Sequence, residues 1–212
     1  QKGKNEINRP LKLGIILLTV AIPTILIIMQ PDYGTAFAFL VSLIFILYVA
    51  GIDKKYIITA ALLVVIIAPI AYFFILPEHA KARIDVYLNP NLDPRGDGYN
   101  IIQSKLAIGA GKLLGMGLLK GNQTQLGYLY PKTTDFIFAV IGEEMGFIIA
   151  GAIIVVYVIL LTKSIKIAKT AKDDLGAYLA SRISGILFFH MLENIGMTMG
   201  LLPITGIPLP FV

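Results

Sequence analysis

The sequence contains no cysteine and only two histidines, His79 and His190. The lack of cysteine excludes disulfides and thiolate metal sites, and two scattered histidines are too few for a histidine metal cluster. Charge is also scarce, because Asp, Glu, Lys and Arg make up 15% of the residues. In a soluble domain, these four residue types make up about a quarter of the residues. This deficit excludes an ordinary water-soluble domain.

Apolar residues fill the space that charge leaves. They make up 57% of the chain, and the mean hydropathy is +0.80. The net charge of +5 could suggest nucleic acid, but the basic residues form short clusters between apolar runs. That pattern is typical of cytoplasmic loops that face anionic membrane lipid, and it argues against nucleic acid as a partner.

Five apolar segments are long enough, or nearly so, to cross a bilayer core of about 30 Å as helices. We therefore predict an all-α integral membrane protein, with residues 1–212 forming a single polytopic membrane domain. A long extracellular loop is expected at about 77–135. The predicted spans are 11–29, 33–52, 56–76, 136–162 and 175–202.

The basic residues predict the orientation of the chain. Ten of the 18 fall on one side of the predicted spans, and the positive-inside rule makes that side cytoplasmic. The N-terminus of this chain is then cytoplasmic and its C-terminus extracellular. The ten are Lys2, Lys4, Arg9, Lys12, Lys54, Lys55, Lys163, Lys166, Lys169 and Lys172.

The long loop has too many residues to serve only as a connection between two spans. Its first half is rich in turn residues, whereas 99–108 is expected to form a short amphipathic helix at the outer interface, with Ile101, Ile102 and Leu106 on its apolar side. Residues 109–117 predict a flexible glycine-rich hinge. They do not form a Walker loop, because Leu113 stands where Ser or Thr must bind magnesium.

Charges within spans are costly unless they are paired or line a cavity. At 1.5 Å per residue, the backbones of Glu144 and Arg182 would differ in depth by only about 6 Å, which an extended arginine can bridge. We therefore predict that these two residues form a structural pair, with Glu143 as the competing partner.

The same depth estimate places three carboxylates, Asp32, Asp135 and Glu193, at the outer face. Two of them also have simpler, structural interpretations. Asp135 could be the N-cap of the fourth span, and Asp32 could be a turn-former. His190 is more often a packed hydrogen-bonding residue than a ligand.

Six loop cations allow two interpretations. They could be solvated, or they could hold an anionic headgroup such as a diphosphate at the outer membrane surface. Composition leaves both open. The six are Arg83, Arg95, Lys105, Lys112, Lys120 and Lys132.

The sequence contains four ordered motifs. They are Gln30-Pro31-Asp32-Tyr33-Gly34-Thr35-Ala36, Gly98-Tyr99-Asn100-Ile101-Ile102-Gln103-Ser104-Lys105, Thr134-Asp135-Phe136-Ile137-Phe138-Ala139 with Glu143-Glu144-Met145-Gly146, and Asn194-Ile195-Gly196-Met197 through Pro203-Ile204-Thr205-Gly206-Ile207-Pro208-Leu209-Pro210-Phe211. Together these motifs resemble the SEDS family of membrane proteins. Residues 103–109 and 123–127 are more similar to its rod-shape branch, RodA, than to its division branch, FtsW.

The resemblance implies a ten-span peptidoglycan glycosyltransferase in the bacterial plasma membrane. Such proteins polymerise undecaprenyl-linked lipid II at the outer face, for cell elongation and rod shape in the RodA branch, and work with a class B penicillin-binding protein that crosslinks the strands. It implies that Asp135 takes the proton of the acceptor hydroxyl. Loop cations, or a divalent cation such as Mg or Mn, would stabilise the leaving diphosphate.

The other site residues are assigned from the same resemblance. Lys105 is the first candidate for binding the substrate, followed by Lys112, Arg83 and Gln103. No residue is assigned as a metal ligand. The residues expected to shape the cavity or position its helices are Asp32, Glu144, Arg182 and Glu193.

The chain also departs from the family pattern. Early spans and the usual Ser/Gly-rich continuation are absent, so a fragment or one piece of a split protein is expected. Members commonly read Pro-Glu-x-His-Thr-Asp where this chain has Tyr130-Pro131-Lys132-Thr133-Thr134-Asp135. Any role of the family's Glu and His therefore cannot be transferred.

Two functions of other classes remain open. A flippase or transporter of a lipid-linked precursor would use Glu144 and Arg182 as pathway residues. A non-catalytic scaffold would only recruit a penicillin-binding protein. Polymer formation from purified lipid II separates the enzyme from both, since neither makes glycan.

Overall fold

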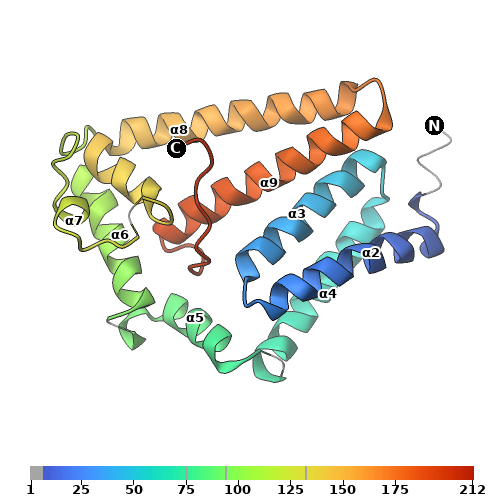
Figure 1. Cartoon of the computed structure of the whole chain (residues 1–212), viewed down its shortest axis with the longest axis horizontal. Helices are drawn as coiled ribbons and strands as arrows, with labels where there is room; N and C mark the ends of the chain where they lie inside the picture. The colour runs from blue at the N-terminus through green and yellow to red at the C-terminus, as the bar shows by residue number, and fades with distance from the viewer. Residues whose placement is uncertain (1–6, 75, 94, 132) are drawn as a thin grey trace. The chain divides into compact units, whose positions relative to one another are not determined.

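The computed structural model describes residues 7–74, 76–93, 95–131 and 133–212 (Figure 1). Regular structure within these ranges is helical. The elements are α2 (Pro10–Met29), α3 (Tyr33–Ala50), α4 (Lys54–Phe74), α5 (Glu78–Leu88), the 3-10 helix η1 (Pro90–Leu92), α6 (Asp97–Gly111), α7 (Asn122–Gln125), α8 (Ile137–Thr170) and α9 (Asp174–Thr198).

Five of the described helices, α2, α3, α4, α8 and α9, are long and apolar enough to cross a membrane. This confirms the predicted all-α membrane fold. The main difference lies at the end of α8, which continues past the predicted limit at residue 162 to Thr170. Lys163, Lys166 and Lys169, which were expected in a loop, instead lie on this helix, whereas Lys172 follows its end. Lys169 lies in the last turn, where a cation complements the helix dipole.

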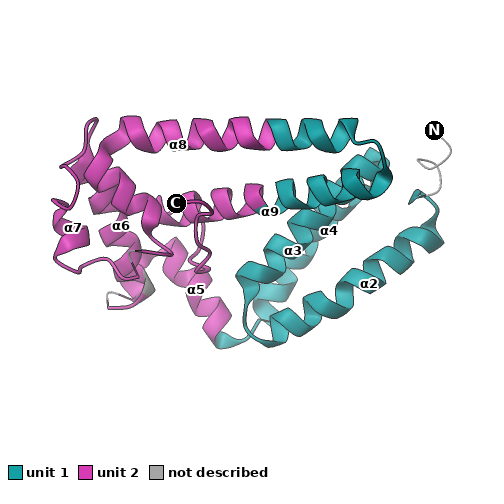
Figure 2. Cartoon of the chain, turned by 45° about the horizontal axis from the view of Figure 1, so that its top comes forward, with its two compact units in different colours: residues 1–78, 163–186 teal, residues 79–162, 187–212 magenta. Residues whose placement is uncertain are grey.

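The chain divides into two compact units, which are coloured separately in Figure 2. Unit 1 comprises residues 1–78 and 163–186, and unit 2 comprises residues 79–162 and 187–212. Helices α8 and α9 therefore contribute to both.

Unit 1 begins with the α2–α3 hairpin. Asp32 ends the turn between the helices and caps α3, because its carboxylate accepts a hydrogen bond from the backbone N–H of Thr35 at 3.0 Å. Gly51 ends α3 with a φ of 85°, a left-handed conformation that glycine adopts without strain. The predicted turn is thus confirmed, and Asp32 is its helix cap.

Polar contacts gather several basic segments at one end of unit 1. Asn8, before α2, donates its side-chain amide to the carbonyl of Gly51 at 3.3 Å and accepts from the N–H of Asp53 at 2.8 Å. The ammonium of Lys169 lies 5.8 Å from the centroid of the Tyr48 ring. The start of α2, the α3–α4 turn and the end of α8 therefore meet, as a shared membrane side requires.

Small residues allow close packing in unit 1. A Cβ added to Gly185 of α9 would lie 2.8 Å from the Cα of Ser42 in α3, so the two backbones touch. Ser181 and Ser184 on the same helix are almost completely buried. Membrane helices commonly pack through such residues, since the lipid supplies no hydrophobic force between them.

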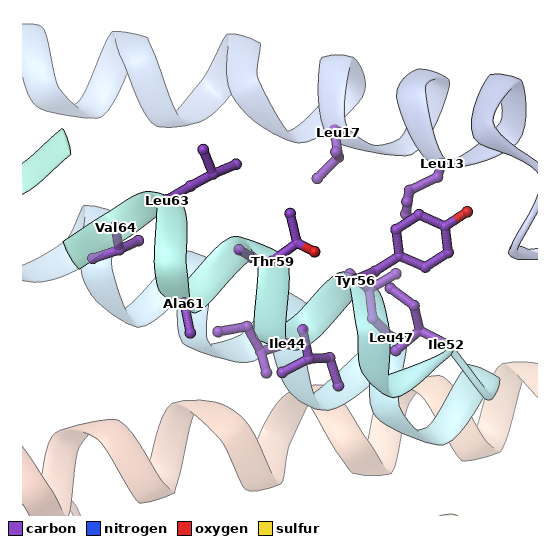
Figure 3. A pocket seen from close by; sticks show the side chains of 12 residues that line it. Leu13, Leu17, Ile44, Leu47, Ile52, Tyr56, Thr59, Ala61, Leu63 and Val64 are labelled. Atoms are coloured by element: carbon purple, nitrogen blue, oxygen red, sulfur yellow. The ribbon is translucent and has the colours of Figure 1, made fainter. Parts of the chain in front are cut away.

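An apolar pocket of about 390 Å³ lies among α2, α3 and α4. Figure 3 shows Leu13 and Leu17 of α2 on one side and Tyr56 and Leu63 of α4 facing them. No residue of α4 is buried, and the side chain of Val65 is 70% exposed. Such apolar exposure is compatible with lipid as the surrounding solvent.

In unit 2, the long loop is mostly structured. Helix α6 is longer than the predicted 99–108, and its buried face carries Ile101, Ser104 and Ala107. The prediction that Ile102 and Leu106 share a face with Ile101 is wrong, because these two are 36% and 51% exposed. The buried face is formed instead by Ile101, Ser104 and Ala107, which are spaced three residues apart and so lie on one side of the helix.

Helix α5 was not predicted. The first half of the loop is not only turns, since Glu78–Leu88 forms three turns of helix before η1. A proline at 77 followed by Glu78 is a typical helix start, and this pattern could have predicted α5 from the sequence.

Helix α8 is broken at Gly146, whose backbone adopts a φ of 78° and a ψ of −179°. Only glycine adopts this conformation readily. The break separates a short helix, 137–145, from the long remainder of α8. It also removes the partners of backbone groups on both sides, which cannot remain unpaired inside a membrane protein.

Residues 112–117 supply the missing partners and contradict the predicted flexible hinge. A Cβ on Gly115 or Gly146 would overlap backbone atoms of the other segment, so both must be glycine for this approach. Four backbone hydrogen bonds cross the break: Met116 N–H to Glu143 O (2.9 Å), Gly117 N–H to Glu144 O (3.0 Å), Phe147 N–H to Lys112 O (2.9 Å) and Ile148 N–H to Leu113 O (3.2 Å).

We predict that Gly146→Ala destabilises the protein. The substitution forces an L residue into the mirror region and drives its Cβ into the backbone of residues 113–115. The free energy of unfolding should fall by about 2 kcal/mol or more. Thermal unfolding in detergent measures the change.

Gly151→Ala is the matched control on the same helix. Nothing lies within 4 Å of a Cβ at Gly151, so this change should be neutral or should stabilise by up to about 1 kcal/mol through helix propensity. Equal melting temperatures for the two variants would contradict the break.

Candidate active site

Asp135 lies in the turn that precedes α8, half-buried and two residues before the helix begins. Within the part of the chain that the structure describes, no hydrogen bond reaches its carboxylate. The N-cap alternative is therefore contradicted, because a cap must accept from the first amides of its helix. The carboxylate remains available as a proton acceptor.

The residue after Asp135 anchors this turn. Phe136 is 1% exposed and packs with Ala107 of α6, Leu129 of the loop and Ala139 of α8. Its N–H donates to the carbonyl of Pro131 at 3.3 Å. Buried aromatic packing thus fixes the backbone next to the carboxylate.

The tail after α9, residues 203–212, is not helical and belongs to unit 2. Three of its carbonyls accept hydrogen bonds from side chains: Ile207 from Asn194 at 2.8 Å, Pro208 from His190 Nδ1 at 3.3 Å, and Pro210 from the Tyr157 hydroxyl. His190 therefore acts as a hydrogen-bonding residue, as the sequence favoured.

Asn194 connects the tail to Asp135. Its side chain is fully buried, and the same Nδ2 that donates to Ile207 also donates to the carbonyl of Asp135 at 2.9 Å. Sequence reasoning noted Asn194 only as the start of a motif. An uncharged amide within an apolar span was the signal that could have singled it out.

Two of the predicted outer carboxylates meet at this tail. Glu193, 5% exposed, accepts a hydrogen bond from the Thr205 hydroxyl at 2.9 Å. Asp135 lies beside Gly206, where an added Cβ would stand 3.3 Å from its Oδ2. Asp32 belongs to unit 1, where it caps α3.

Lys105 lies on α6 next to the end of α9. The hydroxyl of the preceding Ser104 donates to the carbonyl of Thr198 at 2.7 Å and fixes the two helices together. Lys105 is exposed, and a Cβ on Gly200 would overlap the end of its side chain. A cation thus stands where α9 passes into the tail.

None of the contacts described above around Asp135 and the tail involves the other predicted substrate-binding residues. Lys112 is exposed and lines an otherwise apolar groove of about 360 Å³ formed with Ile108, Phe138 and Phe147. Arg83 is exposed on α5, and Gln103 is half-buried on α6. Lys132 lies outside the described residues.

Glu143 holds the loop from inside the helix. It is fully buried, and its carboxylate accepts from the backbone N–H groups of Gln123 at 2.8 Å and Thr124 at 3.0 Å. These amides belong to the first turn of α7, where a carboxylate complements the helix dipole.

Glu144 holds the same loop, which corrects the predicted pair with Arg182. Its carboxylate accepts from the Leu119 N–H at 2.9 Å and the Gln125 side-chain amide at 2.8 Å. The Arg182 guanidinium lies 5.7 Å from the centroid of the Phe39 ring. The depth estimate compared only heights along the two helices and did not include the loop groups that Glu144 meets.

The described residues show no cluster of metal-ligating side chains. They contain no group of three or more His, Cys, Asp or Glu side chains that could hold a metal ion. A divalent cation at the diphosphate stays a prediction.

Comparison with known proteins gives concordant matches. The family described as cell cycle protein, FtsW/RodA/SpoVE, matches residues 1–212. The peptidoglycan glycosyltransferase MrdB of Escherichia coli (strain K12) is 41% identical over 199 residues, which cover 94% of this chain and 54% of that protein. The peptidoglycan glycosyltransferase RodA of Treponema pallidum (strain Nichols) is 42% identical over 137 residues, covering 64% of this chain and 31% of that protein.

A solved structure shares the fold. It is a chain from a peptidoglycan synthase complex that coordinates polymerization and crosslinking; it aligns with a TM-score of 0.76 and 23% identity over 96% of this chain and 56% of that one. The chain spans about half the length of the curated relative MrdB. Because one family matches it from end to end, the chain belongs to the FtsW/RodA/SpoVE family of cell cycle proteins, the SEDS family that its motifs resemble.

Proposed function

We propose that the protein containing this chain is a peptidoglycan glycosyltransferase that polymerises lipid II at the outer face of the bacterial plasma membrane. The names of the relatives MrdB and RodA support this activity, and the second supports a role in elongation and rod shape. The observation that carries the proposal is the position of Asp135, whose carboxylate is fixed through its backbone and accepts no hydrogen bond among the described residues.

The chemistry requires a proton acceptor. As the oxygen of the acceptor hydroxyl attacks the anomeric carbon of the donor sugar, its proton passes to the Asp135 carboxylate. The bond from that carbon to the lipid diphosphate breaks, and the diphosphate leaves with the bonding electrons. A base at the attacking hydroxyl contributes about 10² to 10⁴ in rate.

The leaving diphosphate requires positive charge, and exposed cations of unit 2 are the candidates for it. Lys105 is the first, because it stands at the passage from α9 into the tail that also borders Asp135. Lys112 is the second, because it lines an apolar groove suited to a lipid chain. A class B penicillin-binding protein is the proposed partner, in line with the synthase complex of the structural neighbour.

The two alternatives have less support. A transporter would use Glu144 and Arg182 as pathway residues, but Glu144 is occupied in holding the loop. A scaffold would not need a carboxylate held as Asp135 is. Glycan synthesis from purified lipid II decides between the enzyme and both alternatives.

We predict that Asp135→Asn lowers polymerisation by at least about 10²-fold in the complete protein with its partner. Asparagine keeps the shape and the backbone contacts but cannot accept the proton. Folding and lipid II binding should survive, since the carboxylate makes no hydrogen bond among the described residues. The length and amount of glycan made from purified lipid II are measured.

Asp174→Asn is the matched control. Asp174 is an exposed carboxylate in the first turn of α9, so the same chemical change should leave turnover within about twofold. Near-normal glycan synthesis by a well-folded Asp135→Asn protein would refute the catalytic assignment.

The proposed orientation gives a separate prediction. A cysteine at Asn91 should react with a membrane-impermeant thiol reagent added to intact cells, and one at Lys172 should react only after the cells are opened. Both side chains are exposed, and this chain has no cysteine of its own to interfere. The reverse pattern would place Asp135 on the cytoplasmic side and contradict the proposed site.

A further inference from the structure

Two consecutive residues of α9 hold the tail at its approach to Asp135. Glu193 accepts the Thr205 hydroxyl at 2.9 Å, and Asn194 donates to the carbonyl of Ile207 at 2.8 Å. Gly206 lies between these two attachment points. The stretch 205–207 is thus fixed from α9 on both sides of the residue that borders the Asp135 carboxylate.

Asn194 holds Asp135 with the same nitrogen. The amide NH₂ has two donors, and both are used, one on the carbonyl of Asp135 and one on the carbonyl of Ile207. Carbonyl oxygens only accept, so the nitrogen must face them. One planar group therefore sets how closely the turn before α8 approaches the tail.

Gly206 shows what this spacing achieves. Its φ of 76° lies in the left-handed region, and a Cβ there would stand 3.3 Å from Asp135 Oδ2. A glycine at this point keeps one side of the carboxylate free of any side chain. The tail forms a wall beside the carboxylate without covering it.

The buried amide also carries an unsatisfied atom. Asn194 Oδ1 is buried and has no hydrogen-bond partner in the described part of the chain. An unpaired buried acceptor destabilises a fold, and an apolar side chain at this position would avoid that cost. One turn later on α9, the equally buried Thr198 hydroxyl is satisfied by carbonyls of its own helix. The contrast favours a role for Asn194 beyond stability.

We propose that Asn194 is a positioning residue that sets Asp135 against the tail segment 205–207, and that this segment is a wall of the catalytic site. The proposal rests on the proposed function only in taking Asp135 as the proton acceptor. Asn194 touches no substrate in this assignment. It acts through the backbone of Asp135 and of Ile207.

The test compares Asn194→Ala with Thr198→Ala in the complete protein. Both truncate a fully buried polar side chain on α9, but only the first removes bonds to Asp135 and the tail. Hydrogen exchange of the peptides covering 130–137 and 203–210 should quicken by about tenfold in Asn194→Ala relative to Thr198→Ala. With lipid II, kcat should fall by about 10- to 100-fold while KM stays within about threefold.

A second variant guards against misfolding of Asn194→Ala. Thr205→Val removes the hydroxyl that donates a hydrogen bond to Glu193, and it changes a half-buried residue of the tail itself. It should quicken exchange in 203–210 and lower kcat by a smaller factor than Asn194→Ala.

Exchange and kcat equal to those of Thr198→Ala would overturn the proposal, and so would a loosened tail with unchanged kcat. Failure of the catalytic assignment is seen separately, as normal polymerisation by Asp135→Asn. The exchange measurement does not depend on that outcome, so the two failures can be told apart.

Discussion

Unit 2 depends on the requirement that backbone N–H and C=O groups within a membrane protein be hydrogen-bonded. Helix α8 is broken at Gly146, and an unassisted break would leave amides and carbonyls without partners. Residues 112–117 remove that cost by bonding to both sides of the break. The loop segment is thus as much a part of the α8 backbone as of the loop.

Much of the candidate site follows from this arrangement. Because 112–117 is fixed across the break, the end of α6 and the start of the following loop are also fixed. Glu143 and Glu144, just before the break, then bind residues 119–125 through buried carboxylates. The short helix 137–145 lies between this anchored region and Asp135, so the turn that carries the proposed base rests on a rigid support.

The sequence predicted the features that depend on local composition. Spans follow from apolar length, and all five were found because no tertiary contact is needed to exclude a 20-residue apolar run from water. The family motifs pointed to Asp135 as the candidate base, and that assignment stays a prediction. The break at Gly146 was not predictable, since its cause is a segment some thirty residues earlier in the chain whose glycine must meet it. A glycine within an apolar run is otherwise common in membrane helices.

The errors share this origin. Pairing Glu144 with Arg182 considered only depth along the helices, whereas Glu144 accepts hydrogen bonds from loop groups at Leu119 and Gln125. The hinge at 109–117 was inferred from glycine content, but here the glycines permit close backbone contact. Asn194 escaped notice because its importance lies in two carbonyls that the sequence does not bring together.

The tail carries three prolines among residues 203–210, at positions 203, 208 and 210. A proline has no N–H, so this stretch contains few donors that need a partner in a non-aqueous site. Three of its carbonyls are each bound by one side chain from α8 or α9. In a helix or sheet, neighbouring hydrogen bonds support one another, and a break spreads along the ladder. Here each attachment is independent, so natural variation at one of them can adjust the edge of the site without unravelling the segment that forms it.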